Sequence, residues 1–174
     1  MDSNARREQI KTILGQSTGA VSAGRLSGRL GVSRQIIVGD VALLRAAGCR
    51  IDATPRGYVM RQEGKLVDGT KRAVIVSRHE SSRTEEELNI LVDNGCKVID
   101  VTVEHPVYGQ LTGLLDIASR YDVRNFMNKV AEAGAHSLCE LTDGVHIHTI
   151  EYEDETAYKK ALSELNAAGF IYRE

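Results

Sequence analysis

The stretch from Ser22 to Met60 constrains the fold more than any other part of the chain. Ser22 and Ser33 are both good helix N-caps, and each precedes a run of residues with apolar side chains at helical spacing. The letters GVS, which begin at Gly31, separate the two runs and are typical of a tight turn. The pattern therefore predicts two capped helices, one short and one long, in direct succession.

The flanking residues extend this pair of helices to a larger motif. A helix is predicted over residues 6–14, and the third helix, RQIIVGDVALLRAA, should end at Gly48. The segments CRIDA, TPRG and YVM then predict a strand, a tight turn and a strand. The residues of the third helix that should face the core are Ile37, Val41 and Leu44. Three helices followed by a hairpin are typical of a winged helix-turn-helix domain.

Charge is distributed unevenly along the chain. Residues 1–60 hold nine Lys and Arg against four Asp and Glu, a net charge of +5, whereas residues 61–174 hold thirteen against twenty, a net charge of −7. A basic winged helix-turn-helix favours binding to a polyanion such as DNA. A winged module that makes only protein contacts is the alternative, since a fold does not fix a function.

DNA binding by such a domain predicts a specific set of contacts. The third helix would enter the major groove, where Arg34 and Gln35 can pair with guanine and adenine edges and Val38 can touch a thymine methyl group. Ser33 precedes these residues at the start of the helix. Contacts to phosphate or to the minor groove are expected from Arg25, Arg29 and, at the tip of the wing, Arg56.

The polar stretch MRQEGKLVDGT predicts a boundary between a DNA-binding domain, residues 1–62, and a second domain, residues 70–174. Strand and helix patterns alternate in the second domain, so the chain is expected to be α/β overall. The short TDG connection, between expected strands SLCEL and VHIHTIEY, favours a mixed sheet over a parallel one. The other expected elements are strands AVIVSRH, CKVIDVTV and FIY, and helices from Thr84, across residues 110–134 and from Asp154.

All five histidines fall in the second domain. His146 and His148 alternate along an expected strand and therefore share one face. His79 ends another expected strand, and the three glutamates at 85–87 open the helix that follows it. If the two strands are neighbours, three imidazoles and one carboxylate converge, a ligand set that suits Zn, Ni, Fe or Cu. The alternatives are surface histidines and a solvated acidic helix start.

Longer stretches of this chain resemble a known family. LSGRLGVSRQIIVGDVALLRAAGCRIDATPRGYVM is similar to the helix-turn-helix part of NiaR-type, niacin-responsive repressors, and VIVSRH, VEHPVYGQLTG and DGVHIHTIEY resemble the three-histidine (3H) domain of that family. The resemblance implies a homodimeric repressor of genes for NAD synthesis or niacin uptake, with nicotinic acid as co-repressor and a palindromic operator. It also implies one divalent transition metal per chain (Ni, Zn or Fe), held by His79, Glu87, His146 and His148, although Glu85 and Glu86 are adjacent candidates.

The effector is expected to bind at an open position of this metal. Arg78, His105 and Tyr108 are the candidates to line its pocket. Two other functions for the centre are open: a hydrolase-like metalloenzyme acting on a small pyridine compound, and a regulator whose metal is purely structural. The charged N-terminus and the absence of a long apolar run predict a cytoplasmic protein that does not bind a membrane.

Overall fold

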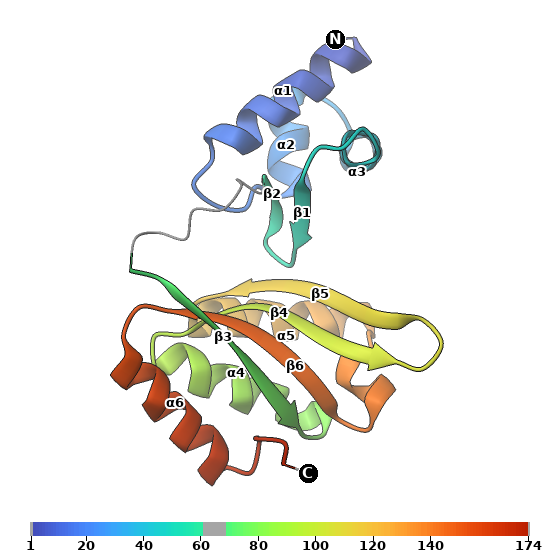
Figure 1. Cartoon of the computed structure of the whole chain (residues 1–174). Helices are drawn as coiled ribbons and strands as arrows, with labels where there is room; N and C mark the ends of the chain where they lie inside the picture. The colour runs from blue at the N-terminus through green and yellow to red at the C-terminus, as the bar shows by residue number, and fades with distance from the viewer. Residues whose placement is uncertain (1, 61–68, 174) are drawn as a thin grey trace. The chain divides into compact units, whose positions relative to one another are not determined.

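The computed structural model describes residues 2–60 and 69–173. The chain divides into two compact units, Met1–Lys65 and Leu66–Glu174, and each is described by itself (Figure 1). Among the described helices, none combines the length and the apolar composition that crossing a membrane requires.

The first unit confirms the predicted winged helix-turn-helix. Its elements in chain order are α1 (Ser3–Gln16), α2 (Ala23–Leu30), α3 (Arg34–Ala46), β1 (Ile51–Thr54) and β2 (Gly57–Met60). Both predicted caps form, because the Ser22 hydroxyl accepts a hydrogen bond from the Arg25 amide and the Ser33 hydroxyl accepts one from the Ile36 amide. The core contains the three predicted residues of α3 together with Ile10, Leu14, Val21, Leu26, Leu30 and Ile51.

Two contacts fix the helices and the wing of this unit. Asp40 is buried on α3 and accepts a hydrogen bond of 2.5 Å from the Arg6 guanidinium of α1. Val21 and Tyr58 exchange two backbone hydrogen bonds of 2.9 Å, which join the start of α2 to the hairpin. The neighbouring Gly57 has a φ of +134°, and a Cβ atom there would lie 2.5 Å from the Val21 backbone, so only glycine allows this close approach.

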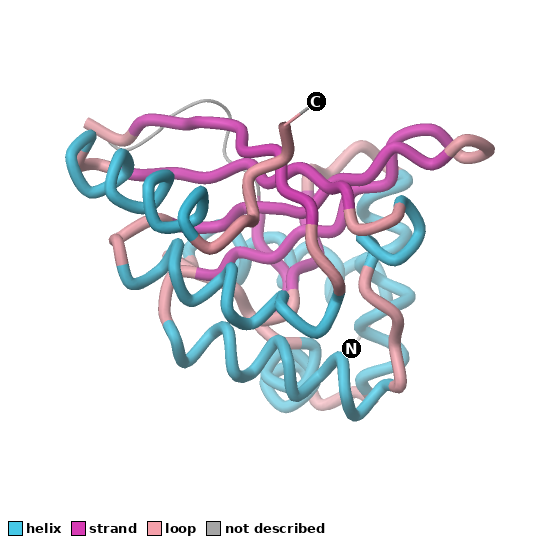
Figure 2. Tube along the Cα trace, turned by 90° about the horizontal axis from the view of Figure 1, so that it is seen from below, coloured by secondary structure: helices cyan, strands magenta, loops and turns pink. Residues whose placement is uncertain are grey.

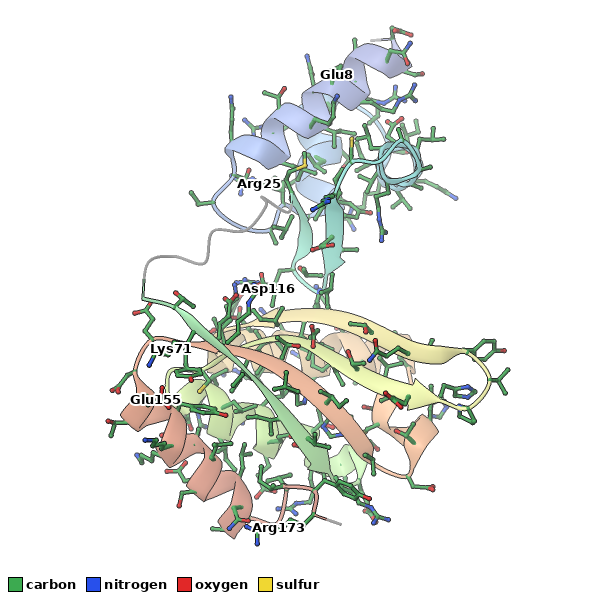
Figure 3. All side chains as sticks on the ribbon, in the orientation of Figure 1. Glu8, Arg25, Lys71, Asp116, Glu155 and Arg173 are labelled. Atoms are coloured by element: carbon green, nitrogen blue, oxygen red, sulfur yellow. The ribbon has the colours of Figure 1, made fainter. Side chains whose placement is uncertain are left out.

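The second unit is a four-stranded sheet with helices along one face (Figures 1 and 2). The strands are β3 (Lys71–Arg78), β4 (Lys97–His105), β5 (Gly109–Ile117) and β6 (Val145–Tyr152), in the order β3-β6-β4-β5. The α-helices are α4 (Thr84–Asp93), α5 (Arg120–Ala133) and α6 (Glu155–Ala167), and the 3-10 helices are η1 (Ser81–Arg83) and η2 (Leu138–Thr142). Lys71 at the start of β3 forms an ion pair of 2.9 Å with Glu155 of α6 (Figure 3).

The α/β class of the chain is confirmed, but the predicted mixed sheet is wrong because every strand pair is antiparallel. The error lies in residues 110–117, which were expected to be helical. Leu111, Leu114 and Leu115 have helical spacing, yet this segment forms β5 and pairs with β4 as a hairpin. Pairing with a neighbouring strand overrides the local pattern here, as is common for short apolar runs.

Two further expected strands are absent from the described residues. The segment SLCEL forms η2 instead of a strand, so the TDG turn connects a 3-10 helix to β6. The segment FIY forms only an isolated bridge between Ile171 and Ser77 at the edge of β3. The core nevertheless contains one residue of each pattern, Cys139 and Phe170.

Candidate metal centre

Three elements of the second unit bring the predicted ligands together. His146 and His148 lie on the inner face of β6, opposite Ser77 and Ile75 of β3, and His79 directly follows β3. The two strands are therefore neighbours, which is the condition for convergence of the three imidazoles. Glu87 lies in the first turn of α4 and is the glutamate of the triplet that is buried.

One carboxylate oxygen contacts all three imidazoles. The Oε2 atom of Glu87 lies 2.6 Å from Nε2 of His79, 3.1 Å from Nε2 of His146 and 3.3 Å from Nε2 of His148. The four side chains are between 0% and 3% exposed. We refer to His79, Glu87, His146 and His148 as the His–Glu centre.

The outer nitrogen of each imidazole is held by a backbone carbonyl. Nδ1 of His79 lies 2.7 Å from the carbonyl of Glu80, Nδ1 of His146 lies 2.9 Å from that of Gly144, and Nδ1 of His148 lies 2.7 Å from that of Asp100. A carbonyl oxygen can only accept, so each Nδ1 must carry a hydrogen. In a neutral imidazole the lone pair is then on Nε2, and three such lone pairs point at a carboxylate. This is the orientation that metal-binding histidines have.

The charges of the centre are compatible with a bound cation. Burial favours the neutral forms of these groups, but their mutual attraction is stronger: the pKa of Glu87 is lowered well below its usual value, and the pKa values of His79 and His148 are raised by Glu87. The carboxylate is thus ionised, and protons on the imidazoles would have to balance it. A divalent ion can replace those protons.

The donor set also includes an unpaired acceptor atom. Among the described residues, Oε1 of Glu87 has no hydrogen-bond partner although it is buried. One ligand atom each of His79, Glu87 and His146 lie within 4.8 Å of one another. The residues therefore fit a transition metal bound by imidazole nitrogen and carboxylate oxygen.

A tight turn supports the centre from behind. The His79 amide donates to the Gly144 carbonyl at 3.3 Å, so the turn before β6 packs on the end of β3. Gly144 has a φ of +85°, and a Cβ atom there would lie 2.4 Å from the His79 carbonyl oxygen. The TDG sequence predicted a turn, but nothing in the sequence indicated that His79 lies against it.

Two cavities adjoin the centre. The outer cavity, about 690 Å³, lies beside His79 and is lined by Arg78, Glu80, Ser82, Glu140 and Asp143, among others. The inner cavity, about 20 Å³, lies against His146 and His148 and is lined by Thr84, Leu88, Val101, Leu115 and Phe126, among others. Cys139 lines both cavities. Thr84 and Cys139 had not been predicted as site residues.

The three predicted effector contacts are not brought together. Arg78 lines the outer cavity, whereas His105 and Tyr108 lie at the tip of the β4–β5 hairpin and line neither cavity. Their ring centroids are 4.9 Å apart, and Nδ1 of His105 accepts hydrogen bonds from the amides of Val107 and Tyr108. An effector role for this pair stays a prediction.

The predicted DNA contacts lie on the surface of the first unit. The exposed residues are Arg25, Arg29, Ser33, Arg34, Gln35, Val38 and Arg56. Ser33 is the N-cap of α3, and Val38 is 51% exposed although it is apolar. The Arg34 side chain rests against Gly24 of α2, where a Cβ atom would lie 2.9 Å from its guanidinium. The start of α3 thus presents the arginine, glutamine and valine side by side.

Together these features define a DNA-binding regulator in which a winged helix-turn-helix precedes a histidine-rich α/β domain. Residues 6–59 match the HTH domain family, and residues 72–174 match the 3H domain family. The chain belongs to the NiaR-type family of transcription repressors.

Two relatives extend over nearly all of the chain. The Probable transcription repressor NiaR of Thermotoga maritima is 43% identical over 172 residues, which are 97% of this chain and 96% of that protein. The Transcription repressor NadR of Bacillus subtilis is 38% identical over 169 residues, which are 97% of this chain and 94% of that protein. The chain is accordingly a transcription regulator, the class that the resemblance implied.

Proposed function

We propose that this protein is a metal-dependent repressor of genes for NAD biosynthesis or niacin uptake, with nicotinic acid as its co-repressor. It would act on operator DNA in the cytoplasm. The observation that carries the proposal is the His–Glu centre, in which the Nε2 atoms of three buried imidazoles converge on one buried carboxylate oxygen. Such a group can hold a cation, and a repressor needs a way to sense its effector.

The proposed cofactor is one divalent ion per chain, Ni, Zn or Fe, held by His79, Glu87, His146 and His148. When bound, the ion would supply a Lewis-acid position for the carboxylate or ring nitrogen of nicotinic acid. Coordination through the carboxylate would discriminate against nicotinamide, whose neutral amide oxygen is the poorer donor. The carbonyls of Glu80, Gly144 and Asp100 keep the three imidazoles in the tautomer that binds metal.

Repression requires that effector binding changes DNA affinity. In a dimer, the effector must favour one arrangement of the two winged domains over another, since a ligand shifts an equilibrium only by its difference in affinity for the two states. Coupling of this kind is usually worth ~1 to 3 kcal/mol, or roughly 5- to 150-fold in DNA affinity.

Calorimetric titration of the metal-loaded protein with nicotinic acid tests this function. We expect the metal-loaded protein to bind nicotinic acid saturably and not to bind nicotinamide. The metal-stripped protein should bind neither compound. Binding that does not depend on metal would refute the proposed role of the His–Glu centre. If the metal-loaded protein binds neither compound, the centre has a structural role instead.

We further propose that the protein is a homodimer, because helix-turn-helix proteins commonly bind the two half-sites of a palindromic operator as dimers. The sheet face opposite the helices carries Val74 and Val76, which are 63% and 38% exposed, and it is a surface on which a second copy could pack.

We expect sedimentation equilibrium of the wild-type protein to give twice the chain mass. Val74→Glu should shift the equilibrium towards monomers, because it places a charge on this apolar surface. Glu153→Lys is the control. A monomeric wild-type protein would contradict this proposal.

A further inference from the structure

The inner cavity lies directly against the His–Glu centre, and we propose that it is the binding site for the aromatic ring of the effector. This inference rests on the function proposed above, since it assumes an effector that is an aromatic carboxylic acid. His146 and His148 line the cavity with their rings, and their Nε2 atoms converge on Glu87. A ligand in the cavity is therefore next to the atoms that would hold the metal.

The walls of the inner cavity suit an aromatic ring. Leu88 of α4, Val101 of β4, Leu115 of β5 and Phe126 of α5 contribute apolar side chains. Small-molecule sites combine such apolar walls with a few polar groups that fix the orientation of the ligand. Phe126 also allows a ring-to-ring contact.

Thr84 supplies a polar group at the same place. Its side chain lines the inner cavity, and its Oγ1 atom is buried without a hydrogen-bond partner in the part of the chain that the structure describes. A buried hydroxyl without a partner is unfavourable, and native proteins rarely keep one. A carboxylate oxygen or a pyridine nitrogen could accept the hydrogen of this hydroxyl.

The outer cavity is less suited to an anionic aromatic acid. It is large, but the carboxylates of Glu80, Glu140 and Asp143 line it together with the single guanidinium of Arg78. Three carboxylates against one cation disfavour a ligand that is itself a carboxylate. We therefore assign the ring of the effector to the inner cavity and not to the outer one.

The inner cavity must widen before a ring can enter. Its volume of about 20 Å³ suits a single water molecule, and small-molecule pockets are usually larger than ~300 Å³. The part of the wall that can move is the segment 131–138, which includes the lining residue Ser137. Within α5 only Asp122 and Val123 are buried, and every residue from Ala131 to His136 is exposed. Elements with so little buried surface open most easily. Cys139 lies between the two cavities, so a shift of η2 would connect them.

The test is calorimetric titration with nicotinic acid of the full-length chain, loaded with the metal that supports binding in the wild type. Leu115→Phe fills the inner cavity and should weaken binding about tenfold or more, because overpacking excludes the ring. The matched control is Leu141→Phe, at a residue that is 48% exposed on η2, and it should change affinity by less than about twofold. Metal content and the circular dichroism spectrum are measured for each variant.

Thr84 provides a second test that does not depend on cavity filling. Thr84→Val keeps the shape of the side chain but removes the hydroxyl, and it should weaken binding about tenfold, whereas Thr84→Ser should retain most of the affinity. If the wild type binds and neither Leu115→Phe nor Thr84→Val weakens binding, the inner site is refuted while the proposed function stands. A loss of binding in Arg78→Ala alone would place the ring in the outer cavity instead. If the metal-loaded wild type does not bind nicotinic acid at all, the proposed function itself fails.

Discussion

Glu87→Gln should lower the affinity of the protein for a divalent transition metal by about 100-fold or more. Structural zinc sites with four ligands have apparent binding free energies of ~10–16 kcal/mol, so one ligand accounts for roughly 2.5–4 kcal/mol. The substitution keeps the size of the side chain and removes only the charge. Its amide can still donate to an Nε2 lone pair, so we expect the α/β domain to fold. Competition titration of Zn against a chelating dye measures the affinity.

The adjacent Glu86 is the matched control for this experiment. Its side chain is 51% exposed and pairs with Arg83 at 3.0 Å, outside the His–Glu centre. Glu86→Gln should therefore leave metal affinity unchanged within about twofold. Equal losses in both variants would mean that the acidic start of α4 attracts metal without binding it, and an unchanged affinity in Glu87→Gln would remove Glu87 from the ligand set.

The distinction between Glu86 and Glu87 shows which parts of the site the sequence could predict. The strand period of two places His146 and His148 on one face, and the structure has them there. The helical period also contained part of the answer for the glutamates. Leu88 and Leu91 are the buried apolar residues of α4, and Glu87 lies on their side of the helix, four positions before Leu91. The apolar stripe thus excluded Glu86, but Glu85 lies three positions before Leu88, so only the structure separates Glu85 from Glu87.

Features that depend on contacts with another segment of the chain were not predictable in this way. Residues 109–117 have apolar residues at helical spacing, and only the presence of β4 as a partner makes them a strand. The contact between Gly144 and His79 and the two cavities are of the same kind. The local patterns of the winged helix-turn-helix succeeded because its caps, turn and hairpin are specified by neighbouring residues.

The second prediction concerns DNA binding by the first unit. Arg34→Ala should weaken binding to the operator by roughly 5- to 150-fold. This loss corresponds to the ~1–3 kcal/mol that one bidentate contact to guanine contributes. The substitution should also relax specificity at one base pair. Arg34 is suited to this role because it lies in the first exposed turn of α3, which Ser33 caps. Fluorescence anisotropy with a duplex obtained by selection from random sequences measures the loss.

Arg29→Ala is the comparison that separates base contacts from phosphate contacts. Arg29 is exposed at the end of α2, where a phosphate contact would position the domain without contributing specificity. Its loss should weaken binding to selected and scrambled duplexes alike and lower the salt dependence by about one phosphate contact. If Arg34→Ala shows this same uniform loss, α3 is not the recognition helix.

The residues of the two functions lie within different units of the chain. Neither Arg34→Ala nor Arg29→Ala should therefore alter metal affinity, and Glu87→Gln should not alter binding to scrambled DNA.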